Sequence, residues 1–209
     1  MPPMPRGRLV YVMGPSGSGK DSVIGFARAR YSDLPHIAFA HRYITRPAAA
    51  GGENHVELAP AEFLVRRNAG CFALSWRSHG NDYGLGREID FWMSAGLSVV
   101  ANGSRAHFAN AAGRYPDLLP VLVQVDPARL SERLRVRDRE DAAGRASRVA
   151  QAAGDPPRHP ALEIIDNNGL LSAAGDALVA LLQRLRAPAR ALVPTIGGFR
   201  ASPFTEPTR

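Results

Sequence analysis

The sequence predicts an α/β fold in which a five-stranded, mostly parallel sheet is covered by helices on both faces. Two observations lead to this prediction. Five short apolar segments alternate with amphipathic helical patterns along the chain. The first apolar segment runs directly into a glycine-rich loop, "GPSGSGK" at residues 14–20, and a helical pattern follows at once. Because parallel strands need long crossover connections, this alternation favours a parallel sheet.

The predicted strands are the apolar segments, which lie at 8–13, 36–41, 97–101, 120–125 and 162–166. The predicted helix after the glycine-rich loop carries its apolar side chains on one face, namely Val23, Ile24, Ala27 and Tyr31. The last predicted helix has the spacing of a core-facing helix, with apolar positions at Leu170, Leu171, Ala174, Leu178, Leu181, Leu182 and Leu185.

Two segments depart from this alternation. Residues 42–95 contain "RYITRPAAAGGENH", a short helix that begins at Pro60, and a β-hairpin around "SHGNDYG", so we expect an insertion on the α/β core. Residues 187–209 contain four prolines and no periodic pattern, which predicts a poorly ordered C-terminal tail.

The composition argues against several classes of protein. No apolar run approaches the roughly 20 residues that a membrane-spanning helix requires. The apolar segment at the N-terminus is too short for a signal peptide, so we expect a cytoplasmic protein that does not bind membranes. The net charge is +7, but the arginines are scattered, without a basic tail. We therefore expect small anionic substrates and no nucleic acid.

The glycine-rich loop matches the pattern G-x-x-x-x-G-K, and it lies between a strand and a helix, as a phosphate-binding loop requires. In such loops successive backbone N–H groups turn inward around a phosphate, and the helix N-terminus adds partial positive charge. The chain has 25 arginines and one lysine, Lys20, which indicates that a compact charge is needed there. The expected ATP-binding residues are Gly14, Pro15, Ser16, Gly17, Ser18, Gly19, Lys20, Asp21 and Ser22.

One position in this loop is unusual. The residue after the lysine is normally a hydroxyl residue that coordinates Mg²⁺, but here it is Asp21, and Ser22 follows. A carboxylate is a good Mg²⁺ ligand, so we expect Mg²⁺ to bind with ATP at Asp21 and Ser22. The strand at 97–101 ends near Asn102, where related folds often have an aspartate. Asp21 would then replace the missing carboxylate, although the two changes could also be incidental.

The chain resembles the guanylate kinase family over nearly all of residues 8–186. The resemblance rests on "GPSGSGK", "ITRP" followed by "GEN", "GNDYG" and "RLRVRDRE". The segments "MGPSGSGKDS", "HRYITR", "ENH", "LSW", "EID" and "NGSR" are more similar to one branch of it, the ribose 1,5-bisphosphate phosphokinases of phosphonate degradation. The glycine-rich loop alone is shared by many NTPases, whereas this combination is much more specific.

The resemblance implies a P-loop NTPase fold, with a kinase domain at 1–186, a substrate-binding insertion at about 42–95 and a helical lid at about 128–150. It also implies an activity, the Mg²⁺-dependent transfer of a phosphoryl group from ATP to ribose 1,5-bisphosphate. The products would be 5-phosphoribosyl 1-diphosphate and ADP.

The resemblance further suggests roles for individual side chains. Arg46 and Tyr83 match the residues that hold the acceptor phosphate, and Arg133 and Arg137 match the catalytic arginines of the lid. Guanylate kinases read the guanine edge with a carboxylate just before a tryptophan, but here that position is Ser75. Losing such a contact forfeits much of the discrimination for a base, which favours a phosphorylated sugar.

Further substrate-binding candidates follow from position. Asn102, Ser104 and Arg105 lie just after a predicted strand, and α/β folds bind ligands at the carboxyl ends of their strands. Arg42 is another candidate for contact with an anion. His55 is a weaker one, because a lone histidine in a loop is more often a surface residue.

Two other functions stay open from the sequence. One is a guanylate-type nucleoside monophosphate kinase, against which Ser75 argues. The other is a non-catalytic guanylate kinase-like binding module, but such modules tend to lose the lysine of the phosphate loop, and Lys20 is present. The oligomeric state is also open, with a dimer as one alternative.

Overall fold

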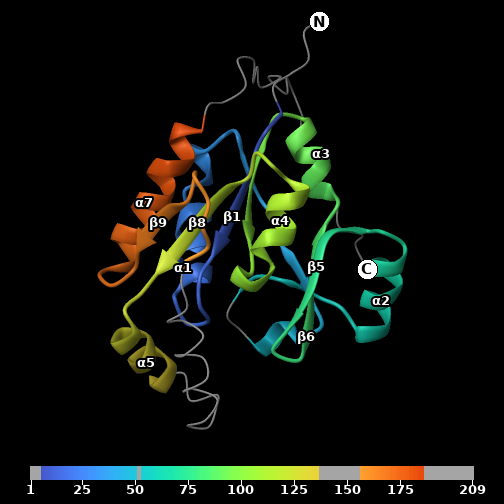
Figure 1. The fold of residues 1–209 in the computed structure, drawn as a ribbon, viewed down its shortest axis with the longest axis horizontal. Helices are drawn as coiled ribbons and strands as arrows, with labels where there is room; N and C mark the ends of the chain where they lie inside the picture. The colour runs from blue at the N-terminus through green and yellow to red at the C-terminus, as the bar shows by residue number, and fades with distance from the viewer. Residues whose placement is uncertain (1–5, 51–52, 137–155, 186–209) are drawn as a thin grey trace, which may run out of the picture.

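The computed structural model describes residues 6–50, 53–136 and 156–185 (Figure 1). Its central element is a five-stranded parallel sheet with the strand order β2-β7-β1-β8-β9. The strands are β1 (Leu9–Met13), β2 (Ile37–Phe39), β7 (Ser98–Asn102), β8 (Leu119–Gln124) and β9 (Glu163–Asp166). Each lies within one or two residues of its predicted position, which confirms the predicted fold class.

Helices cover both faces of this sheet (Figure 1). On one face lie α1 (Lys20–Ala29) and α7 (Leu171–Arg184), and on the other lie α3 (Glu88–Ser94) and α4 (Phe108–Arg114). The central strand β1 is buried along its whole length and serves both layers, because alternate side chains point to opposite faces. Val10 and Val12 pack with α1 and α7, whereas the side chains that pack with α3 and α4 are those of Leu9, Tyr11 and Met13.

A second sheet, with the order β4-β3-β6-β5, is built from the chain between β2 and β7. It contains β3 (Arg42–Ile44), β4 (Val56–Glu57), β5 (Phe72–Ser78) and β6 (Asn81–Gly86), with α2 (Pro60–Asn68) between β4 and β5. The helix at Pro60 and the hairpin around "SHGNDYG" both occur where the sequence predicts them. One face of this sheet carries Ile44, Trp76, Tyr83 and Leu85 into the same apolar cluster as Leu9 of β1.

The short helices complete the described chain. They are the 3₁₀ turns η1 (Tyr31–Asp33), η2 (Ala48–Ala50) and η3 (Arg105–His107) and the helix α5 (Pro127–Val136). Leu130 of α5 is fully buried. The rest of the expected lid, including Arg137, and the expected tail at 187–209 lie outside the described residues. Within the described ranges no helix has both the length and the apolar composition of a membrane span.

Three apolar positions were predicted wrongly. Tyr31 is 51% exposed because α1 ends at Ala29 and the chain turns into η1, which takes Tyr31 off the apolar face of the helix. Leu170 is 77% exposed because α7 begins one residue later, and Leu171, the first residue of α7, is 42% exposed. The rest of the pattern is confirmed, since Leu178, Leu181 and Leu182 are buried.

Candidate active site

The phosphate loop lies at the carboxyl edge of the parallel sheet, directly after the central strand β1, and α1 begins at Lys20. Gly17 and Gly19 have φ angles of +87° and +86°, a conformation that glycine adopts without the steric cost other residues meet. All the ATP-binding residues expected from the sequence therefore belong to one loop and the first turn of one helix. Backbone N–H groups at a helix N-terminus provide a site suited to an anion.

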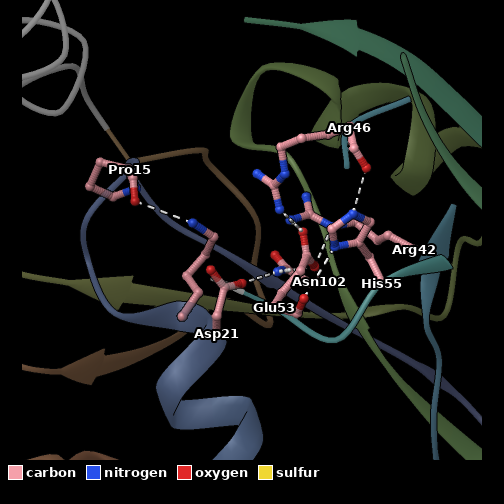
Figure 2. A network of polar contacts seen from close by, with 8 residues as sticks. Pro15, Asp21, Arg42, Arg46, Glu53, His55 and Asn102 are labelled. Atoms are coloured by element: carbon pink, nitrogen blue, oxygen red, sulfur yellow. Dashed lines mark hydrogen bonds and ion pairs between the residues drawn. The ribbon is translucent and has the colours of Figure 1, made fainter. Parts of the chain in front are cut away.

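Lys20 reaches back across this loop. Its Nζ donates a hydrogen bond to the backbone oxygen of Pro15 at 3.2 Å (Figure 2). The ammonium group is thus held at the rim of the loop, and the aliphatic part of the side chain is half-buried. This is where a compact cation would meet the outer phosphates of a bound nucleotide.

Asp21 and Asn102 are in direct contact. The sequence suggested only that the carboxylate of Asp21 could replace the one missing at Asn102. Asn102 ends β7, and because β7 pairs with β1, its Cα is the register partner of Val12 just before the phosphate loop. The Asn102 Nδ2 donates hydrogen bonds to Asp21 Oδ1 and, at 3.2 Å, to Glu53 Oε2 (Figure 2). One amide nitrogen therefore joins two carboxylates from distant segments.

Glu53 was not among the predicted site residues, although it belongs to the "GEN" segment that carries the family resemblance. Its carboxylate lies between Arg42, the first residue of β3, and Arg46, which follows that strand. Arg42 binds it through two nitrogens, with Nε 2.8 Å from Glu53 Oε2, and Arg46 NH2 lies 3.6 Å from Oε1. The Glu53 and Arg42 side chains are only 10% and 12% exposed, so this ion pair is largely shielded from solvent.

His55 is buried, which corrects the expectation of a surface residue. Its Nε2 lies 2.9 Å from the backbone oxygen of Arg46, and its Nδ1 lies 3.1 Å from the backbone oxygen of Glu53. The imidazole thus braces the two chain segments that present Arg46 and Glu53 (Figure 2). These contacts give His55 a structural role in the site.

Aromatic rings form the wall beside these arginines. Trp76 and Tyr83 stack with their ring centres 5.6 Å apart and their planes within 3°, and the Arg42 guanidinium lies 5.0 Å from the centre of the Tyr83 ring. Ser75 is exposed, and because neighbouring residues of a strand point to opposite faces, it lies on the other face of β5 from Trp76. The face that carries Tyr83 therefore presents Arg42 and two aromatic rings beside the apolar side chains of Ile44 and Leu85.

The loop after β7, which contains Ser104 and Arg105, is fixed from below by Tyr11. The Ser104 N–H donates to Tyr11 Oη at 2.8 Å, and Tyr11 Oη lies 3.1 Å from the Ser104 oxygen. Burial raises the pKa of Tyr11 to about 12, against smaller opposing effects of the Ser104 backbone and of the Arg42 charge. The hydroxyl consequently stays protonated and holds the loop at every physiological pH. Arg105 is half-buried at the start of η3.

A pocket of about 420 Å³ lies on the other side of the phosphate loop. It is lined by Gly17, Gly19, Ser22, Glu132, Arg133, Asn167 and Leu171. Ser22 faces this pocket because successive helical residues are rotated by about 100°, so it is directed away from the Asp21 cluster. Arg133 NH2 donates to the backbone oxygen of Asn167 at 2.8 Å, which places this predicted lid arginine beside the phosphate loop.

Unpaired buried polar atoms concentrate in the same region. Among the described residues, four buried side-chain nitrogen or oxygen atoms have no hydrogen-bond partner, namely Ser18 Oγ, Arg28 Nε, Arg46 Nε and Asn102 Oδ1. Three of the four belong to the phosphate loop or to the network around Glu53. Buried polar groups are nearly always paired in folded proteins, so these atoms indicate a site that a polar ligand completes.

The comparisons with known proteins bear on the family and the fold of the chain. The chain is 54% identical over 175 residues to the ribose 1,5-bisphosphate phosphokinase PhnN of Desulfomicrobium baculatum, which covers 84% of this chain and 94% of that protein. It is 49% identical over 188 residues to the protein of the same name from Thiobacillus denitrificans, covering 90% and 99%. Among solved structures, the guanylate kinase of Anaplasma phagocytophilum matches 86% of each chain at 18% identity with a TM-score of 0.58, which supports the fold. No protein-family model matches the chain.

Proposed function

We propose that this chain, which belongs to the ribose 1,5-bisphosphate phosphokinase family, transfers the γ-phosphoryl group of ATP to ribose 1,5-bisphosphate. The products are 5-phosphoribosyl 1-diphosphate and ADP. One observation carries the proposal: the network of Asp21, Asn102 and Glu53 connects a phosphate loop directly to two partly buried arginines, Arg42 and Arg46. A nucleotide and a second phosphorylated molecule would meet across this network.

The phosphate loop and the pocket beside it are assigned to ATP. The loop N–H groups and Lys20 hold the β- and γ-phosphates. The pocket of about 420 Å³ takes the nucleoside, since ligand pockets are typically about 300–1,000 Å³ in volume. The pocket borders Gly17 and Gly19, which supports this assignment, because the nucleoside would then lie next to the bound phosphates.

Mg²⁺ is the expected companion of ATP, and the residues present fit it. Mg²⁺ in nucleotide sites is usually held by one or two carboxylates together with phosphate oxygens and water. Asp21 offers such a carboxylate next to the loop, and the unpaired Asn102 Oδ1 lies in the same cluster. We assign the metal to Asp21, while Ser22, the other residue suggested by the sequence, lines the nucleoside pocket. The bound metal would offset the negative charge of the phosphates.

The second sheet and the loop after β7 are assigned to the acceptor. Arg46 and Arg42 would bind one phosphate of the sugar, with Tyr83 beneath them, and Ser104 and Arg105 would approach it from the sheet edge. The attacking oxygen belongs to a phosphate that is already ionised at neutral pH, so the reaction needs no strong general base. Its rate then depends on positioning and on charge neutralisation by Lys20, Arg133 and Arg137.

The direct test is a substrate panel. The purified protein is incubated with ATP, Mg²⁺ and one of GMP, AMP, ribose 5-phosphate or ribose 1,5-bisphosphate, and the products are identified by phosphorus NMR. The expected result is a new diphosphate resonance with ribose 1,5-bisphosphate alone, and its absence in the Lys20→Ala variant excludes a contaminating kinase. Formation of GDP from GMP would replace this proposal with a guanylate-type kinase.

A further inference from the structure

We infer that Asn167 is a positioning residue for the phosphate loop, and that its side chain orients the Ser18–Gly19 peptide so that the Gly19 N–H faces the bound phosphates. This inference rests on the proposed binding of ATP. It concerns a residue outside the loop itself, in the turn between β9 and α7.

Asn167 is held in place by three segments of the chain. Its backbone N–H donates to the Gln124 oxygen at the end of β8 at 2.9 Å. Its backbone oxygen accepts a hydrogen bond from Arg133 of α5 at 2.8 Å. Its side-chain Nδ2 donates to the Ser18 oxygen at 2.7 Å, and the residue is only 3% exposed. Because the backbone of Asn167 is held by hydrogen bonds and its side chain is buried, this residue is able to impose one orientation on the loop.

The hydrogen bond from Asn167 to the Ser18 oxygen also orients the N–H group of Gly19, because both groups belong to one peptide unit. In a trans peptide the C=O and the following N–H point in opposite directions. When Asn167 captures the Ser18 oxygen from outside the loop, the N–H of Gly19 is directed away from Asn167 and toward the interior of the loop. A phosphate-binding loop depends on N–H groups that are already oriented before the anion arrives, because such groups need no reorganisation on binding.

The packing around Gly19 supports the same conclusion. A Cβ atom added at Gly19 would collide with Asn167 Nδ2, so the loop backbone and this side chain are in close contact. Gly19 is thus needed both for its positive φ and for the approach of Asn167. The next residue, Asn168, behaves differently: its Oδ1 accepts from the Asp126 N–H at 2.8 Å and ties down the turn before α5.

The test compares Asn167→Leu with the matched control Asn168→Ala. Leucine keeps the number and branching of the side-chain heavy atoms and adds no charge, so the variant removes the hydrogen bond without changing the net charge of the site. Dissociation constants are measured for ATP, tripolyphosphate and adenosine by displacement of a fluorescent ATP analogue. We expect Asn167→Leu to weaken ATP and tripolyphosphate by a similar factor of about ten, since one buried hydrogen bond is lost. Asn167 also lines the pocket assigned to the nucleoside, so adenosine binding of Asn167→Leu should weaken less than tripolyphosphate binding rather than stay constant. All constants of Asn168→Ala should stay near those of the parent.

The outcomes separate the alternatives. Weaker adenosine binding with unchanged tripolyphosphate binding would make Asn167 a nucleoside contact and overturn the inference, as would unchanged binding of all three ligands. If the leucine variant does not fold, Asn167→Ala makes the same comparison without added bulk. The amide resonance of Gly19 gives a second readout, because its shift on adding tripolyphosphate should shrink in the variant. A parent protein that binds no ATP would instead contradict the proposed function itself.

Discussion

The carboxamide of Asn102 donates a hydrogen bond to the carboxylate of Asp21, which lies 81 residues earlier in the chain. The contact joins the end of β7 to the first turn of α1, beside the phosphate loop. The same nitrogen reaches Glu53, so two negative groups share one neutral donor. Arg42 and Arg46 compensate the charge of Glu53, whereas a divalent cation bound with ATP would compensate Asp21 better than the neutral amide of Asn102 does.

Asp21→Asn should raise the Mg²⁺ concentration needed for half-maximal activity. The change keeps the size of the side chain and removes the charge that we assign to the metal. Without metal the sign reverses, since Asp21 then repels the phosphates, and the asparagine variant should bind metal-free ATP at least as tightly as the parent. The measurements are a Mg²⁺ titration of activity at fixed ATP and a calorimetric titration of ATP in EDTA.

Asp21→Ser supplies the control for that experiment, because it restores the usual hydroxyl but leaves the site without its carboxylate. It should resemble Asp21→Asn in its demand for Mg²⁺. Adding Asn102→Asp to the serine variant should recover part of the metal affinity. A Mg²⁺ midpoint that stays at the parent value in Asp21→Asn would remove Asp21 from the metal site.

Lys20→Ala should abolish most of the turnover while the protein stays folded, because the half-buried side chain faces the loop and not the core. Lys20→Arg should also be poorly active, since the planar guanidinium cannot replace a compact ammonium at the rim of the loop. Turnover is followed by ADP release, and thermal unfolding confirms the fold. Near-normal kcat in Lys20→Ala would refute the assignment of the phosphate loop.

Glu53→Gln should raise the KM for the acceptor much more than it changes ATP affinity. The neutral amide cannot hold Arg42 through two charged contacts or keep Arg46 beside it, so the proposed phosphate grip loses its fixed geometry. Glu62→Gln is the control, because Glu62 pairs with Arg66 on the exposed surface of α2, where an ion pair contributes little. Equal acceptor KM values for the two variants would show that Glu53 does not contribute to binding of the acceptor.

Arg133→Ala should lower kcat more than it weakens ATP binding, if Arg133 moves from its contact with Asn167 to the transferring phosphoryl group during turnover. Arginines in this role are worth about 10³–10⁵ in rate, and sharing the role with Arg137 would make each single loss smaller. Arg129→Ala, on an exposed position of the same helix, should behave like the parent. Parent-like kcat in Arg133→Ala would leave Arg133 with only its structural contact.

His41→Gln should make the free energy of unfolding depend less on pH in the acidic range. Burial, and then the charge of Arg28, lower the pKa of His41 below 6.5, against a smaller opposing effect of Glu88. Arg28 and Asn54 both donate to its Nε2, at 3.0 and 3.2 Å, and protonation would destroy that acceptor.

The unfolded chain therefore binds the proton more readily, and the contribution of His41 is complete above pH 6.5 and is lost as the pH falls below it. The free energy of unfolding, measured by urea denaturation between pH 5 and 7, should therefore fall more steeply with decreasing pH in the parent than in the variant. Parallel profiles would show that His41 does not titrate on unfolding.

The sequence predicted the parallel sheet and the phosphate loop well, because both are encoded locally. A strand buried on both faces is a continuous apolar run, and the loop is one contiguous motif between a strand and a helix. Glu53 and Asn167 were not predicted as site residues, and His55 was named only as a weak candidate for substrate contact, because their roles come from partners that only the fold brings near. A buried ion pair, an imidazole between two backbone oxygens and an amide on a distant carbonyl leave no periodic pattern in the chain.

The second sheet has a consequence for how this enzyme could be altered. The second sheet lies within one continuous segment of the chain, here called the excursion, which runs from the end of β2 through α3 to the start of β7. The strands β2 and β7 are hydrogen-bonded neighbours. Both attachment points are thus adjacent, so a recombined chain could exchange the excursion without cutting the nucleotide half. However, Trp76 and Tyr83 share one apolar cluster with Tyr11 beneath the phosphate loop. A transplanted excursion with different rings would disturb that common core, so a chimaera designed for a new acceptor must keep these ring volumes while it varies Arg46 and its neighbours.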